Sequence, residues 1–328
     1  ALVFTLFGAS YEVARLFTVA TMAASAGCIA VLVYRLVPEP RAGLAAALAA
    51  GLLHGSAFVP TWSCTYPHWT AELLLLVGLV LLTGRRSESS AAAGGALIAS
   101  SALCILSLGV PVLLTAGVVV FLLYGARRGL LHFAGAGAPI VLCLAYFGLV
   151  GGLDDFIYAT LVWPFSSYGL GQSDLSGYAS YIERTIGNHA RLGVPWSWCG
   201  WVLAQLTAWG PKLAFVGGAL AGGLALCLQL FGRIQSKRKG NGMLIALCSA
   251  AVCSPLVLGV SRNDMTHLAF VGSFGLLGVA AVFSLVPVDS VRRWGAVSLF
   301  STCILFVLPN HLNMHRYTDP DMRSWREY

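Results

Sequence analysis

The amino-acid sequence predicts an all-α fold, a polytopic transmembrane helical bundle with about ten spans. Hydrophobic residues make up 58% of the chain and charged residues only 10%, whereas an ordinary soluble domain carries about 25% charged residues. Apolar windows of roughly 20 residues, the length that crosses a hydrocarbon core, recur along nearly the whole chain. Unbroken runs such as LIALCSAAVCSPLVLGV differ from the short alternating segments of β-barrels. We therefore expect most of the surface of the chain to contact the hydrocarbon core of a membrane.

The ten predicted spans follow one another with short connections for most of the chain. They cover residues 13–36, 42–60, 70–84, 92–108, 110–126, 132–152, 211–232, 242–260, 267–286 and 293–309. The fourth and fifth run together through LSLGVPVLL, where Gly109 and Pro111 are expected to break the helix and form a tight hairpin. The prediction is a single transmembrane domain over residues 1–328, without a separate soluble domain.

Basic residues predict the orientation, because Lys and Arg are retained in cytoplasmic loops. They cluster on alternate connections: Arg35 with Arg41, Arg85 with Arg86, Arg127 with Arg128, the run 233–239, and Arg292 with Arg293. Both termini are then expected on the extracytoplasmic side. The membrane is expected to be the bacterial inner membrane. The net charge of +7 follows from this topology, and no aromatic-interleaved basic face indicates nucleic-acid binding.

The longest outward segment, residues 153–210, is expected to carry short interfacial helices near 176–187 and 197–209. A polar tail, residues 310–328, is expected on the same side. Cys64 and Cys199 are the two cysteines expected outside the membrane, where an oxidising compartment would allow a disulfide between them.

The segment SRNDMTH, between two predicted spans, holds Arg262, Asp264 and His267. An arginine fork can bind a phosphate, Asp264 can act as a base or ligand, and His267 can relay a proton. Helix capping by Asp264 and an arginine that reaches to water explain the same residues equally well.

Three more candidates lie within or beside apolar segments. His68 and Glu72 are four residues apart and share one helical face. His54 lies deeper in the second span. Ionisable residues at membrane depth usually face a cavity or a partner, although an isolated histidine is often structural.

Asp154 and Asp155 open the long outward segment. They could bind a divalent cation or a sugar hydroxyl, or simply be solvated at a helix end. His311 and His315 have a helical spacing that suits metal ligation, but no third ligand is evident, so the sequence indicates no certain cofactor.

Residues 2–38, LVFTLFGASYEVARLFTVATMAASAGCIAVLVYRLVP, resemble bacterial GT-C-class membrane glycosyltransferases of the protein-mannosyltransferase-like group. An LFG-x-S-x-x-x-A-R pattern carries most of the likeness, and the Arg-x-Asp-x-x-His segment at Arg262, Asp264 and His267 adds to it. The resemblance begins after the family's first outer loop, so the chain is expected to be N-terminally truncated relative to that family.

The resemblance implies transfer of a sugar from a polyprenyl-phosphate donor to an acceptor on the outer face. The family's catalytic carboxylate belongs to the first outer loop, which would precede Ala1, so no residue here is assigned that role. By position, Arg15, Glu72, Arg262 and His267 are expected to line the donor cavity. A transporter or flippase of amphiphilic substrates and a non-catalytic membrane assembly subunit remain as alternatives.

Overall fold

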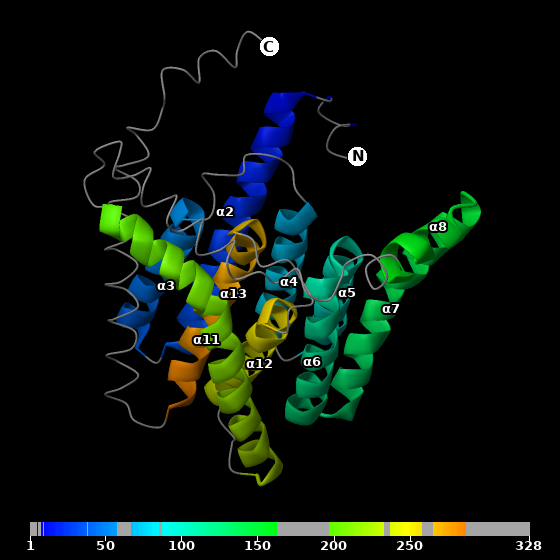
Figure 1. Ribbon diagram of the computed structural model, residues 1–328. Coiled ribbons are helices and arrows are strands. Elements are labelled where there is room, and N and C mark those ends of the chain that lie inside the picture. The colour runs from blue at the N-terminus through cyan, green and yellow to red at the C-terminus, as the bar shows by residue number, and fades with distance from the viewer. Residues whose placement is uncertain are drawn as a thin grey trace.

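A computed structural model describes residues 10–37, 39–57, 67–84, 87–162, 197–232, 237–257 and 265–286, with Thr5 and Gly8 before them. All regular structure in these ranges is helical, as expected. The helices are α2 (Tyr11–Leu36), α3 (Pro40–Ala57), α4 (Pro67–Thr83), α5 (Glu88–Cys104), α6 (Leu106–Tyr124), α7 (Ala126–Leu149), α8 (Leu153–Ile157), the π-helix η1 (Tyr158–Val162), α11 (Ser197–Leu230), α12 (Lys237–Val257) and α13 (Met265–Leu285). Figure 1 shows them gathered into one bundle, with α8 projecting from the end of α7.

Four helical segments are long and apolar enough to cross a membrane: Glu12–Leu36, Leu106–Tyr124, Ala126–Leu149 and Lys212–Leu230. Pro67–Thr83 and Val271–Leu285 are apolar but shorter. The first nine predicted spans each fall on a helix, and the tenth, residues 293–309, lies outside the described residues. A count of ten crossings therefore stays a prediction.

The hairpin between the fourth and fifth predicted spans turns earlier than expected. Ile105, with φ −148° and ψ 102°, separates α5 from α6, so the break does not occur at Gly109 and Pro111. Both residues lie inside α6. A Cβ at Gly109 would collide with the backbone of Ala102 on α5. Gly109 therefore allows close packing of the two helices instead of ending one of them.

The predicted interfacial helix at 197–209 is not a separate element. The structure continues it through Pro211 into the next span, so that α11 runs for 34 residues. Residues 153–162, expected to be the start of a loop, form α8 and η1. The other expected interfacial helix, 176–187, and both Cys64 and the tail 310–328 lie outside the described residues; for Cys199 the backbone alone is described, within α11.

The basic helix ends gather at one end of the bundle, which we call the basic end. Arg127 at the start of α7 forms an ion pair of 3.1 Å with Glu88 at the start of α5. Asn241, near the start of α12, donates to the carbonyl of Thr83 at the end of α4, at 3.1 Å. The helices therefore alternate in direction as predicted, and α2, α4 and α13 all run towards the basic end.

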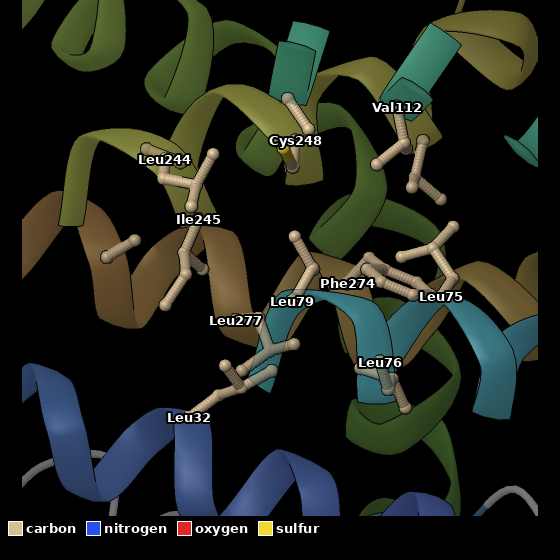
Figure 2. Packing of buried hydrophobic residues seen from close by; sticks show 14 of the residues in the cluster. Leu32, Leu75, Leu76, Leu79, Val112, Leu244, Ile245, Cys248, Phe274 and Leu277 are labelled. Atoms are coloured by element: carbon tan, nitrogen blue, oxygen red, sulfur yellow. The ribbon is translucent and has the colours of Figure 1, made fainter. Parts of the chain in front are cut away.

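The core lies where α2, α4, α12 and α13 meet. Leu32, Leu79 and Leu277 come from three different helices and are fully buried in one cluster, in which Figure 2 shows them together. Elsewhere the helices approach closely through glycine. A Cβ at Gly95 would collide with the backbone carbonyl of His132, and one at Gly135 with that of Ala92. Small residues thus hold α5 against α7 where no large side chain fits.

Large apolar side chains also cover the outside of the bundle. Leu142 and Leu149 of α7 are 71% and 88% exposed, and Leu220 of α11 is 71% exposed. A water-soluble protein rarely leaves such side chains exposed along whole helices. These faces suit contact with lipid acyl chains.

Candidate functional site

The inward face of α2 changes from apolar to polar along the helix. Near the basic end it buries Ile29 and Leu32 completely. Further from the basic end the buried residues are Ser25, Thr21 and Thr18, which are 0%, 5% and 2% exposed. Residues 18, 25 and 32 are seven apart and so share one face of the helix. Thr18 and Ser25 therefore lie on the same face of α2 as Leu32.

Helices α4 and α13 also bury a polar side chain in this part of the bundle. On α4, Glu72 is 1% exposed and lies between the buried residues Trp69 and Leu75. On α13, the fully buried Ser273 lies between the buried residues Val271 and Phe274. Each of the three parallel helices therefore buries at least one polar side chain away from the basic end.

A direct hydrogen bond joins two of these helices. Ser273 Oγ donates to Glu72 Oε1 at 2.6 Å. Ser101 Oγ of α5 donates to the carbonyl of Ala71, beside Glu72, at 2.7 Å. On the α2 side, Cys28 is close enough to interact electrostatically with Glu72. We call Ser25, Cys28, Glu72 and Ser273 the inner polar cluster.

The register between α2 and α4 puts Ser25 and Glu72 at a similar level along the bundle. Arg35 of α2 contacts Val80 and Thr83 of α4, so partners on these parallel helices differ by 45 to 48 in residue number. The same offset places Glu72 opposite residues 24–27 of α2. The interaction between Cys28 and Glu72 agrees with this register.

The structure brings some predicted candidates to this cluster and leaves another apart. His68 is half-buried and lies one turn before Glu72 on α4. Arg15 is exposed and precedes Cys28 by 13 residues, about 20 Å along the helix. The structure therefore does not bring Arg15 to the inner polar cluster, and its place in a donor cavity stays a prediction.

The remaining candidates are described in part or not at all. His267 belongs to the first turn of α13, about 9 Å along the axis from Ser273, and only its backbone is described. The same holds for His54, which lies within α3. Arg262 and Asp264 lie outside the described residues.

Asp154 and Asp155 are exposed and lie in the first turn of α8. Within the described residues, helix α8 packs mainly against α7 and η1, and no hydrogen bond or ion pair joins these carboxyl groups to the inner polar cluster. No group of three or more potential metal ligands occurs within the described residues. A cation at Asp154 and Asp155 stays a prediction.

A second polar network at the basic end was not predicted from the sequence. Arg35 donates through one guanidinium nitrogen to the carbonyl of Val80 and, at 2.7 Å, to the hydroxyl of Thr83. Asn241 donates to the Thr83 carbonyl at 3.1 Å and accepts from the Tyr124 hydroxyl at 3.5 Å. We call Arg35, Thr83, Tyr124 and Asn241 the basic-end network.

His132 is another buried polar residue that sequence reasoning missed. It lies on α7, is 0% exposed, and its Nε2 atom is 3.3 Å from the carbonyl of Leu113 on α6. The sequence contained one signal for this contact: His132 lies in an apolar segment, three residues before Gly135, and small residues are typical of closely packed helices. The position supports a structural contact among α5, α6 and α7.

Comparisons with known proteins identify no relative: no protein-family model, no curated protein and no solved structure matches this chain.

Proposed function

We propose that this chain is the membrane-embedded part of a glycosyltransferase, which transfers a sugar from a polyprenyl-phosphate donor to an acceptor on the extracytoplasmic face. One observation carries the proposal: away from the basic end, α2, α4 and α13 bury polar side chains, among them Glu72, which is bound by Ser273. Under this proposal the basic end faces the cytoplasm of a bacterial cell, and both termini of the chain lie outside.

The inner polar cluster would support the substrate site from within the bundle, because Ser25, Glu72 and Ser273 are buried and the adjoining leucines belong to the core. The exposed apolar faces of α7 and α11 suit an isoprenoid chain. The resemblance of residues 2–38 to GT-C-class enzymes supports a sugar in particular. The helices that are long and apolar enough to cross a membrane support a donor that is anchored in the lipid bilayer.

Glu72 acts in this proposal as a positioning residue. Its side chain is 1% exposed and bound by Ser273, so it is not open to a substrate arriving from the surface. The bond fixes the first half of α4 against α13, the helix whose first turn contains His267. Arg262 and His267 would then meet the donor phosphate and stabilise the charge that develops on the leaving group.

The test is a transfer assay on the full-length gene product in nanodiscs with polyprenyl-phosphate hexose and pentose donors. We expect release of polyprenyl phosphate, and a large loss of the rate with Arg262→Ala. Arg127→Ala, at the exposed ion pair of the basic end, is the matched control and should retain activity.

Two other results would reject the proposal. Movement of the intact donor between leaflets of a proteoliposome, without cleavage, would indicate a transporter or flippase. A chain that neither cleaves nor moves these lipids, but is required for assembly of a membrane complex, would be a non-catalytic subunit.

A further inference from the structure

The turn after α7 sets the direction of the chain that follows it. Gly151, with φ +72°, adopts the left-handed conformation that ends many helices. Its amide donates to the carbonyl of Gly148 at 3.4 Å, and the amide of Gly152 donates to that of Phe147 at 2.9 Å. These two bonds form a Schellman motif, so α7 ends there and α8 starts as a separate helix.

A ring contact holds α8 in a fixed direction relative to α7. The rings of Phe147 and Phe156 stack with their centroids 4.4 Å apart and their planes 18° from parallel. The amide of Phe156 also donates to the carbonyl of Gly152 at 3.0 Å. Helix α8 therefore projects from the bundle in a defined direction, as Figure 1 shows, and η1 continues it to Val162.

The length of α7 places this turn at the membrane surface opposite the basic end. Ala126–Leu149 is one of the segments that are long and apolar enough to cross a membrane. Arg127 at the basic end and Phe147 are 20 residues apart, which is about 30 Å along a helix and matches the thickness of a hydrocarbon core. Tyr146 is exposed at the same level, where tyrosine is typical of membrane proteins. Helix α8 therefore begins just beyond the hydrocarbon core.

Helices α8 and η1 carry apolar and polar side chains on opposite faces. The apolar residues recur at i, i+3, i+4 and i+8, the spacing of one helical face: Leu153, Phe156, Ile157 and Leu161. Asp154, Asp155 and Tyr158 lie on the opposite face. Ile157 and Leu161 are 38% and 53% exposed, so the protein leaves much of the apolar face uncovered.

The surroundings of this amphipathic segment indicate lipid as its partner. The exposed apolar surface of α7 continues along the chain through Leu149 and Val150 to the start of α8. No Lys or Arg occurs in residues 129–183, as is typical of segments on the side of the membrane away from the cytoplasm. The segment would therefore bind lipid through its apolar face, and not through attraction to anionic headgroups.

We propose that α8 and η1 lie in the headgroup layer of the leaflet opposite the basic end. Their apolar face enters the boundary between headgroups and acyl chains, while Asp154 and Asp155 face water. The spanning helix α7 holds the segment at the surface, so no electrostatic attraction is needed to keep it there. This position does not depend on the proposed sugar transfer.

The test measures the depth of spin labels attached to single cysteines. The full chain, with its native cysteines replaced by serine or alanine, is placed in nanodiscs of phosphatidylcholine, which has no net charge. Labels at Ile157→Cys and Leu161→Cys report on the apolar face, and a label at Asp155→Cys reports on the polar face. Leu142→Cys, exposed within α7, is the control in lipid, and Ser89→Cys, exposed at the start of α5, is the control in water. Collisions with oxygen, which concentrates in lipid, are compared with collisions with a water-soluble nickel chelate.

We expect the labels at Ile157 and Leu161 to collide more often with oxygen than with the nickel chelate. Their depth should be about 5–10 Å into the boundary between headgroups and acyl chains. The label at Asp155 should show the opposite preference, although it is only two residues from Ile157. The label at Leu142 should lie deeper than all three.

Two results would overturn the proposal. Equal access of the nickel chelate to Ile157, Leu161 and Asp155 would place α8 and η1 in water. Poor access of both reagents to Ile157 and Leu161 would mean that protein covers the apolar face, either another part of this chain or a second copy. Neither result would count against the proposed function, because no donor lipid enters the measurement.

Discussion

The basic-end network and the inner polar cluster are both built on α4, yet they use their polar groups differently. At the basic end, Arg35 and Asn241 come from other helices and bind the carbonyls at the end of α4, which a helix leaves without internal partners. In the inner cluster, Ser273 binds one oxygen of Glu72, and Ser25 is buried without a protein partner.

The difference separates a structural contact from a candidate binding position. The basic-end network caps α4 and ties it to α2 and α12, as expected of groups that hold helices together. In the inner polar cluster, the buried hydroxyl of Ser25 makes no hydrogen bond to the protein. Function is therefore best sought away from the basic end, and four predictions test this contrast.

The largest expected effect is an all-or-none difference in maleimide labelling between positions on opposite sides of the membrane. In a background in which the native cysteines are replaced by serine or alanine, Pro67→Cys, exposed at the start of α4, should react with an impermeant maleimide added to intact cells. In the same background, Ser89→Cys, exposed at the start of α5, should react only after permeabilisation. Equal labelling of both positions in intact cells would contradict the opposed orientation of the two regions.

Arg35→Ala should destabilise the bundle most among the polar substitutions, by about 3 kcal/mol, because two charge-assisted hydrogen bonds are lost. Chemical unfolding of the detergent-solubilised chain measures this change. Arg35→Lys should recover part of the loss, since one ammonium group reaches fewer acceptors than a guanidinium. An unchanged stability in Arg35→Ala would remove the structural role assigned to this network.

Ser273→Ala should cost about 1–2 kcal/mol, because it removes the donor to the buried carboxyl of Glu72. Ser254→Ala is the control: Ser254 bonds only to the carbonyl of Ala251 within its own helix, and its loss should change stability little. Unfolding of the two variants side by side measures the difference. Equal effects would mean that the bond to Glu72 does not tie α4 to α13.

Tyr124→Phe should have the smallest effect, about 0.5 kcal/mol, because the Tyr124 hydroxyl lies 3.5 Å from Asn241 at the limit of a hydrogen bond. Asn241→Ala should cost more, since its 3.1 Å bond caps the Thr83 carbonyl. If Tyr124→Phe proved as damaging as Asn241→Ala, the network would depend on the aromatic hydroxyl instead.

The sequence by itself determined the helical membrane class and most helix positions, because burial in hydrocarbon requires long apolar segments and internal backbone hydrogen bonds. It also predicted that basic helix ends would share one end of the bundle, as the contacts of Arg127 and Asn241 confirm. It selected Glu72 for its charge at membrane depth. Its association of Arg15 with that site stays a prediction, since Arg15 lies about 20 Å along α2 from Cys28.

Tertiary structure alone decided which polar side chains meet. Ser25 and Ser273 stand in segments that are apolar on every side, so helical periodicity does not reveal the face that each presents to its neighbours. Packing likewise overrides the break predicted at Gly109 and Pro111, since α6 continues through both residues, and α11 continues across the boundary predicted between residues 209 and 211. Local residue order fixes where a helix can form, whereas the register between helices fixes which groups come within bonding distance.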